Sequence, residues 1–252
     1  MLTFAVRHWA AWAGGLEQPD AWERWCRAPS PLTRAGSPAL EFLPPLFRRR
    51  CSSLSRLMLH VAYAAAGPDG IGTLPTVFAS RYGELALTLS LLESLARSQP
   101  LTAAGFTHTV HNAQVGLFSI ASRNREMATA LSAGPDTFPC AILEALALAE
   151  RAGGGPVLVV MADEPVPAGF EVFDDDPFAS YALALVIERA DAGPRVGLVP
   201  SSSDTPPSRP SWPHAIEFLR WLLSKEPALT LGGRRRLPQR ALKATTFTRV
   251  SA

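Results

Sequence analysis

Apolar residues recur along this chain with two spacings, one typical of strands and one typical of helices. Short apolar or alternating runs predict strands at Leu2–Trp12, Thr76–Ser80, Met127–Ser132, Val157–Met161, Tyr181–Glu188 and Val196–Val199. Three- and four-residue spacing predicts helices from Ser52 or Ser53 to Ala66, at Leu85–Arg97, at Ala113–Ser122, from Asp136 or Thr137 to Arg151, and at His214–Ser224. This alternation of strands and helices predicts an α/β fold, with an apolar sheet covered by helices on both faces.

Two segments and the tail interrupt this order. Residues 13–50 combine tryptophans with many prolines. The prolines predict an excursion that lacks long regular elements, and the tryptophans predict that it packs against another part of the protein. Residues 200–213 are rich in Ser and Pro, as linkers are, and the tail from Gly232 is basic and irregular. We therefore expect one domain over residues 1–200, with a linker, a closing helix and a basic tail over residues 201–252 packed on it.

The charge content narrows the classes of partner. Of the 252 residues, 47% are hydrophobic and 18% are charged, against roughly 25% charged in a typical soluble domain. The net charge is +2, so the overall balance does not call for nucleic acid. A low charged fraction in a chain of this size predicts that part of its surface is buried against a partner.

Cysteine usage and the N-terminus bear on the compartment. Cys26, Cys51 and Cys140 are widely spaced and include no CxxC pair, which argues against a disulfide framework or a zinc site. The first residues lack a basic leader followed by a long apolar core, and no run approaches the ~18 apolar residues of a membrane span. We expect a protein of the reducing cytoplasm, with no membrane span, nucleic acid, metal or cofactor.

Cys140 is the first candidate for chemistry. It stands in the opening turn of a predicted helix, just after a predicted strand. A helix dipole lowers the pKa of a thiol at such a position, which suits a nucleophile. The alternative is a small apolar residue that packs beneath Pro139 and Ile142, because buried cysteine is common.

Other polar groups give weaker signals. His108 and His111, beside Asn112, would suit a base or a metal pair, but strand-like alternation places the two histidines on opposite faces. A structural polar turn is favoured there. Asp174–Asp176 would suit a divalent cation or a solvated turn, and Arg234–Arg236 an acidic partner or a solvated tail. The sequence contains no P-loop, GxGxxG or HExxH motif.

One long stretch carries a set of motifs in a fixed order. They are Phe106-Thr-His-Thr-Val-His-Asn-Ala113, Gly116, Ser119-Ile-Ala121, Ser132-Ala-Gly-Pro-Asp136, Leu143-Glu-Ala145 and Val157-Leu-Val-Val-Met-Ala-Asp-Glu-Pro165. This stretch resembles the N-terminal half of a β-ketoacyl synthase, in the short branch identified as chain length factors of aryl polyene pigment clusters. The closing Phe218–Leu223 helix also fits, and the likeness is weakest over residues 13–50.

The resemblance implies a thiolase-like fold, whose full members join two similar halves, with only the first half present here. In full synthases the nucleophilic cysteine caps the helix after the third strand, in a Thr-Ala-Cys-Ser-Ser context. Here the run is Asp136-Thr-Phe-Pro-Cys140, and the helix register puts Pro139 at the nucleophile's place. A shift of one residue turns a side chain by about 100° around a helix.

The catalytic histidines of the synthases come from the second half, where they stabilise enolate and oxyanion charge. After Cys140 this chain has only His214, outside the family's surroundings. The resemblance therefore implies a non-catalytic chain length factor that pairs with an active ketosynthase, helps to bound the acyl tunnel, and meets an acyl carrier protein through that complex. The alternatives are an acyl-thioester transferase or hydrolase that uses Cys140 with His111 as base, and a solitary binding module for acyl chains.

The family also implies where the partner binds. In thiolase-like dimers the third strand of the first half pairs with its counterpart across the two-fold axis, and here that strand is Met127–Ser132. The preceding helix would lie beside the interface, with Phe118 limiting chain extension. The expected tunnel and interface residues are Gly116, Leu117, Phe118, Met127 and Leu131. The expected structural motif residues are His111, Asn112, Asp163, Glu164 and Pro165.

Overall fold

The computed structural model describes residues 1–33, 36–170, 179–192, 194–203, 212–232 and 242–250. The strands are β1 (Leu2–Ala13), β2 (Thr76–Ala79), β3 (Ala128–Leu131), β4 (Val157–Asp163), β5 (Tyr181–Arg189), β6 (Arg195–Ser203), β7 (Ala228–Gly232) and β8 (Leu242–Val250). The α-helices are α1 (Pro19–Arg27), α2 (Pro45–Arg48), α3 (Ser53–Gly70), α4 (Leu85–Ala96), α5 (Ala103–Thr109), α6 (Ala113–Ser122), α7 (Thr137–Arg151) and α8 (His214–Leu223). A 3-10 turn, η1 (Gly134–Asp136), precedes α7.

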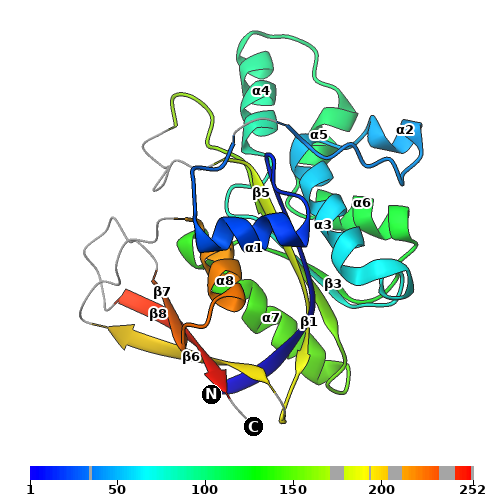
Figure 1. The fold of residues 1–252 in the computed structure, drawn as a ribbon. Coiled ribbons are helices and arrows are strands. Elements are labelled where there is room, and N and C mark those ends of the chain that lie inside the picture. The colour runs from blue at the N-terminus through cyan, green and yellow to red at the C-terminus, as the bar shows by residue number, and fades with distance from the viewer. Residues whose placement is uncertain (34–35, 171–178, 193, 204–211, 233–241, 251–252) are drawn as a thin grey trace.

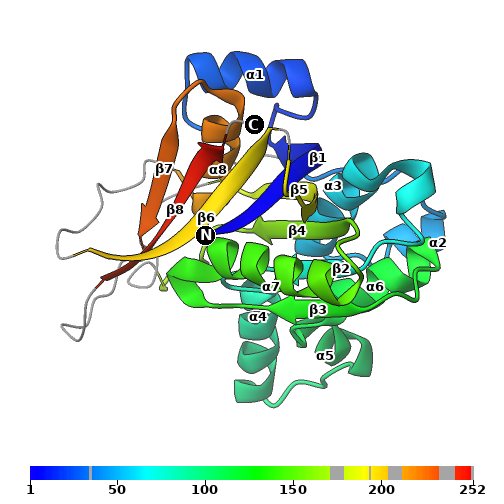
Figure 2. The same cartoon turned by 90° about the horizontal axis from the view of Figure 1, so that it is seen from below.

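The strands form one eight-stranded sheet in the order β3-β2-β4-β5-β1-β6-β8-β7. Strand β2 is parallel to both β3 and β4, whereas every pairing from β4 to β7 is antiparallel. The parallel strands therefore lie at one end of the sheet, and β3 is its edge. In Figure 2 the sheet runs from β3, beside α6 and α7, to β7 beside α8.

Side chains of the central strands alternate between two cores. Val157, Val159 and Met161 face a core shared with α1, α7 and α8, whereas Leu158 and Val160 face a core shared with α3 and α6. Each face of β4 is fully buried, as the uninterrupted apolar run of its sequence predicts. Figure 1 shows α3 and α6 on one side of the sheet and α7 and α8 on the other. The predicted covering of both sheet faces is confirmed.

Helix α3 begins and ends at the predicted signals. The side chain of Ser52 accepts a hydrogen bond from the Ser55 N–H, which satisfies one free donor of the first turn. Gly67 adopts a left-handed φ of 65° and breaks the regular helix before Pro68. The apolar face predicted for this helix is buried under β1, β4 and β5.

The tryptophan-rich excursion packs on both faces of the sheet: Trp22 and Trp25 of α1 join the core opposite α3, whereas Leu40 and Leu43 join the core on the α3 face. Pro19 stands in the first turn of α1, where its missing N–H is tolerated. The indole N–H of Trp22 donates to the Ala11 carbonyl of β1 at 3.0 Å. The Trp25 ring lies edge-on to Trp212, with centroids 4.9 Å apart. This segment thus packs on the sheet and beside α8, and it contains a regular helix that the proline content had not predicted.

Three predictions of local structure were wrong. His108, which strand-like alternation was expected to place on the face opposite His111, lies in helix α5, whose first turn is capped by Thr102. Strand β6 continues to Ser203 into the expected linker. The tail expected to be irregular contributes β8, which pairs with both β6 and β7. Strands from both sides of residue 200 share one sheet, and the division at that residue stays a prediction.

The aromatic cluster that joins α7 to the C-terminal elements predicts a large loss of stability on truncation. Phe138 is buried, and its ring centroid lies 5.1 Å from that of Phe218 and 6.3 Å from that of Phe247. We expect Phe138→Ala to lower the free energy of unfolding by about 3–5 kcal/mol in chemical denaturation. Phe106→Ala, at an exposed ring, is the control and should change it by less than about 0.5 kcal/mol. Equal effects of the two variants would contradict the cluster's role.

Candidate functional site

Large apolar side chains are exposed mainly in one segment of the chain. Among the described residues, seven of the twelve exposed large apolar side chains fall between residues 92 and 127. We call this set the apolar surface: Leu92, Leu95, Leu101, Phe106, Val110, Ile120 and Met127. Its elements contact one another in sequence, α4 with α5, α5 with α6 and α6 with β3. Exposed apolar side chains gathered on neighbouring elements are typical of binding surfaces.

Helices α4 and α5 extend from the body as an arm, residues 85–110 (Figure 1). Helix α4 forms where the sequence predicts it, yet none of its residues is buried. Its leucines cover a broad arc of the helix rather than a narrow stripe, and Ser90 and Glu93 lie on the remaining face; the leucines are Leu85, Leu87, Leu89, Leu91, Leu92 and Leu95. A helix face this wide and apolar is normally packed against another element. The exposed fractions of 59% at Leu95 and 65% at Phe106 indicate a surface that this chain leaves uncovered.

The edge strand β3 adjoins this surface. Strand β3 pairs with β2 alone among the described strands, so its other side presents unpaired backbone groups. The Met127 side chain before the strand is 39% exposed, and Leu131 at its end is half-buried. The structure thus brings both predicted interface residues to a free sheet edge.

Helix α6 presents an exposed face and a buried face. Gly116 and Ile120 lie on the exposed face, with Ile120 71% exposed, and Leu117 is half-buried. Phe118 is 1% exposed, and its ring packs 5.2 Å from that of Phe78. The described residues of this chain enclose the Phe118 ring, and its limiting of chain extension stays a prediction. Ile120 is the large side chain of α6 that faces outwards.

The carboxyl ends of the parallel strands hold a buried acidic group. Asp163, at the end of β4, is 2% exposed. Its Oδ1 accepts hydrogen bonds from the Ser80 hydroxyl at 2.7 Å and from the backbone N–H groups of Arg81 and Tyr82. Its Oδ2 accepts one from the Tyr181 hydroxyl at 2.9 Å. Asp163 therefore connects the turn after β2 to the end of β4 and the start of β5.

Burial and hydrogen bonding have opposite effects on the pKa of Asp163. Burial raises the pKa of the carboxyl group, and the bonds from Ser80, Tyr181 and the two N–H groups oppose that rise. Burial and the adjacent carboxyl group raise the pKa of Tyr181 well above its usual value. Each of the four donors to Asp163 joins it to a neighbouring strand or turn. Glu164 and Pro165, the next two residues, are half-buried. The sequence pattern indicated Asp163 but not Ser80 or Tyr181. The only signal for these two is that Ser80 directly follows the apolar strand β2 and Tyr181 begins the apolar strand β5.

His111 and Asn112 lie in the turn between α5 and α6. Both residues are exposed, and Asn112 occupies the N-cap position of α6 without a side-chain capping bond. The turn is closed by backbone atoms instead, with the Ala113 N–H donating to the Val110 carbonyl at 3.0 Å. The expected bonding of the Asn112 side chain to nearby backbone is therefore not present.

Cys140 lies in the first part of α7, but its surroundings do not activate the thiol. Burial and the charge of Asp136 raise the pKa of Cys140, opposite to the direction expected from the helix dipole. The preceding Pro139 is buried, and Cys140 itself is half-buried. The thiolate form that a nucleophile needs is therefore disfavoured.

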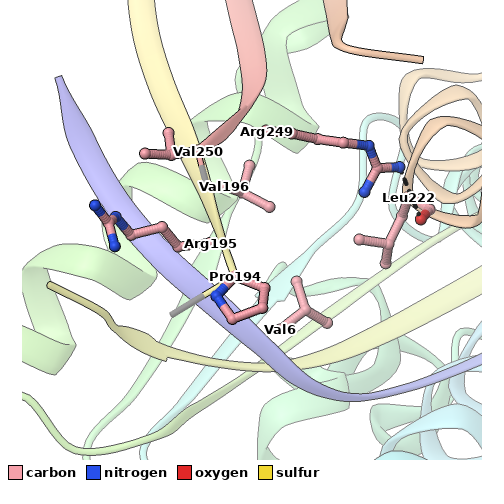
Figure 3. Close-up of a pocket in the computed structure, with 7 residues that line it drawn as sticks. All are labelled: Val6, Pro194, Arg195, Val196, Leu222, Arg249 and Val250. Atoms are coloured by element: carbon pink, nitrogen blue, oxygen red, sulfur yellow. Dashed lines mark hydrogen bonds between the residues drawn. The ribbon is translucent and has the colours of Figure 1, made fainter. Parts of the chain in front are cut away.

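A separate pocket of about 420 Å³ opens beside α8, far along the sheet from β3 (Figure 3). Most of its lining is aliphatic, including Val6 and Leu222. Arg249 donates hydrogen bonds to the Trp221, Leu222 and Ser224 carbonyls at the end of α8, and its guanidinium stacks on Trp221. In Figure 3 the Arg195 and Arg249 guanidinium groups lie on opposite sides of the pocket. The polar groups therefore do not converge on a reacting centre.

Two sequence candidates, Asp174–Asp176 and Arg234–Arg236, lie outside the described residues. Within the described part of the chain, no cluster of three His, Cys, Asp or Glu side chains could hold a metal ion. None of the described helices combines the length and hydropathy of a membrane-spanning segment.

Comparison with protein families assigns most of the chain. The family described as "Beta-ketoacyl synthase, N-terminal domain" matches residues 22–237. No curated protein matches the sequence.

Solved structures give the same result for the fold. A chain from the complex of the ketosynthase ApeO with its chain length factor ApeC, from Xenorhabdus doucetiae, is 26% identical, with a TM-score of 0.80 over 98% of this chain and 100% of that chain. The ishigamide ketosynthase/chain length factor is 17% identical, with a TM-score of 0.64 over 80% of this chain and 68% of that chain. A chain from a type II PKS acyl-carrier protein in complex with its ketosynthase is 10% identical, with a TM-score of 0.66 over 99% of both chains. The predicted α/β, thiolase-like fold, with a single half formed by a helix-covered sheet, is confirmed.

The hydrogen bonds around Asp163 predict the effect of removing one donor. We expect Tyr181→Phe to lower the free energy of unfolding by about 1–3 kcal/mol, because a buried carboxyl group loses a partner. Tyr63→Phe is the control, since the described contacts of Tyr63 are those of its ring. Thermal or chemical denaturation of both variants measures the difference, and a Tyr181→Phe variant as stable as the parent chain would contradict the structural role.

Proposed function

Because the chain belongs to the family of β-ketoacyl synthase N-terminal domains, we propose that it is a chain length factor. In this role it pairs with an active ketosynthase, performs no condensation itself, and helps to bound the acyl tunnel of the complex. The observation that carries the proposal is the apolar surface beside the free edge of β3. The Xenorhabdus doucetiae complex, in which a ketosynthase is bound to its chain length factor, supports the same reading.

The arrangement of the uncovered elements suits a two-subunit assembly. An edge strand that pairs with a partner strand loses its unpaired backbone groups, and flanking helices then bury their apolar side chains. Strand β3, the exposed face of α6 and the arm occur together at one end of the sheet. Stable partners of this kind bury large apolar interfaces, which also accounts for a charged fraction of 18%.

The chemical groups argue for a subunit without its own condensation activity. Burial and Asp136 raise the pKa of the Cys140 thiol, and Pro139 takes the place expected for a nucleophile. The one histidine after Cys140 is His214, at the start of α8. These features weigh against the alternative of an acyl-thioester transferase or hydrolase that uses Cys140 with His111, an exposed residue in the turn before α6.

The pathway and the compartment follow as parts of the same proposal. The Val110–Ala113 and Asp163–Pro165 motifs resemble those of aryl polyene chain length factors, so we place the chain in aryl polyene biosynthesis, where an acyl carrier protein would reach it through the complex. The three cysteines are free thiols, which fits a reducing cytoplasm.

The proposed interface predicts that a charge on the exposed face of α6 blocks assembly. Ile120→Arg places an unpaired charge in an apolar contact, so the co-expressed ketosynthase should bind at least about tenfold more weakly. Leu46→Arg is the matched control, because Leu46 is exposed to a similar extent on α2, outside the apolar surface. Size-exclusion chromatography should give a 1:1 complex for the parent chain and the control. A complex that forms equally well with Ile120→Arg would contradict this interface.

The proposed lack of catalysis predicts that Cys140 is dispensable. In the assembled pair, Cys140→Ala should leave the rate of polyene elongation within about threefold of the parent rate, whereas loss of a nucleophile costs several orders of magnitude. Intact mass after incubation with an acyl-carrier thioester should show no acyl adduct on this chain. A large loss of activity with the complex intact, or an adduct on Cys140, would establish the enzymatic alternative.

A further inference from the structure

The loop between α6 and β3 joins two elements of the proposed interface. It consists of residues 123–126, which we call the arginine loop, and Met127 follows it at the edge of the sheet. Arg123, Arg125 and Glu126 of this loop are exposed. Within the described part of the chain, neither arginine side chain forms an ion pair or a hydrogen bond. The loop therefore presents two guanidinium groups, with which no described residue pairs, beside the apolar surface.

Charge is otherwise scarce along this side of the molecule. Between residues 85 and 131, which include the arm, α6 and β3, the only Asp, Glu, Lys or Arg outside the arginine loop are Glu93 and Arg97. Those two form an ion pair with each other on α4, at 3.8 Å. The formal positive charge of the proposed interface is therefore concentrated in the arginine loop, where two arginines outweigh Glu126.

The backbone conformation of Arg123 is unusual for an arginine. Arg123 follows the last residue of α6 with φ 57° and ψ 23°, which is the left-handed region. Glycine is the common residue there, because a Cβ atom is unfavourable in that conformation. A residue kept against its backbone preference points to a use for its side chain. A cation also suits the negative end of a helix dipole, so stability and binding have to be measured separately.

Asn124 fixes the backbone of the arginine loop. It is 4% exposed, and its Nδ2 donates hydrogen bonds to the Ile71 and Leu74 carbonyls at 3.0 and 2.9 Å. Its Oδ1 accepts one from the Glu126 N–H at 2.8 Å, and its own carbonyl accepts one from the Ser119 hydroxyl at 2.6 Å. A loop fixed in this way loses little backbone freedom when its side chains bind a partner.

We propose that the arginine loop is the electrostatic part of the interface, and that it binds carboxylate groups on the ketosynthase surface opposite it. Protein interfaces commonly combine an apolar centre with a polar rim, and the guanidinium group of arginine matches a carboxylate with two hydrogen bonds. The apolar surface and the free edge of β3 supply the centre. The identity of the partner rests on the proposed function, and the acidic surface on that partner is the new inference.

A competition for limiting ketosynthase tests the loop in the complete assembly. Equal amounts of the parent chain and one variant are mixed with a smaller amount of tagged ketosynthase, and intact mass spectrometry gives the ratio of the two chains in the captured complex. In about 50 mM NaCl, the double variant Arg123→Gln, Arg125→Gln should be captured about tenfold less than the parent chain. In about 500 mM NaCl, capture of the two should become nearly equal, because salt screens exposed charges.

Three further variants separate charge from shape and binding from stability. Arg123→Lys, Arg125→Lys keeps both charges and should be captured within about threefold of the parent chain at low salt. Arg123→Gly relieves the left-handed backbone, so the isolated chain should unfold at the same or a higher temperature and still be captured less. Arg49→Gln, Arg50→Gln is the matched control, because it removes two exposed arginines at the end of α2 that no described residue pairs with. This control should compete equally with the parent chain.

Three outcomes would overturn the inference. They are equal capture of the double glutamine variant and the parent chain at low salt, a deficit of the same size at both salt concentrations, and a deficit as large in the α2 control. Failure of the proposed function gives a different result, since the parent chain itself is then not captured. Capture of the parent chain with no effect of the two arginines removes the arginine loop from the interface and leaves the proposed pairing standing.

Discussion

Burial of both faces of the central strands is the constraint on which the rest of the molecule depends. Because successive side chains of β4 and β5 point to opposite faces, an apolar strand needs cover on each side. Helix α3 supplies one cover, and α7 with α1 and α8 supplies the other. With both faces of the central strands covered, the apolar side chains of α4, α5 and the outer side of α6 have no further element of the described chain to pack against. The exposure of the apolar surface therefore follows from the arrangement of the whole sheet rather than from one helix.

The sequence predicted those elements whose pattern is long and local. The ends of α3 could be placed because a Ser cap and a Gly-Pro break have direct conformational effects. Strand β8 could not, because its sequence mixes Lys and Arg with β-branched residues and its pairing with β6 depends on residues far along the chain. Residues 107–109 are all polar and carry no periodicity of their own, and a cap at Thr102 and contact with α4 select a helix there.

The candidate site shows the same limit in chemical terms. Asp163 was recognisable as a special residue, but the direction of its hydrogen bonds required the turn after β2 and the start of β5. For Cys140 the helix position predicted a lowered thiol pKa, and burial with Asp136 reversed it. For Phe118 the residue pattern predicted the helix but not its rotation about the helix axis, which places the ring inside. The low proportion of charged residues did predict that part of the surface would be suited to burial against a partner.

The place of β1 in the sheet has a consequence for biosynthesis. This first strand lies between β5 and β6, and Phe4 pairs with both Arg189 and Val196. A ribosome adds about 5–20 residues per second, so β1 waits roughly 10–40 s before either neighbour exists. Throughout that time the backbone N–H and C=O groups of β1 have no partner strand, although α1 and α3, which are made soon after it, can already pack on its side chains. A strand that waits for partners so distant in the sequence presents unpaired edges to other chains during synthesis, and β1 reaches its final place only after β5 and β6 are made.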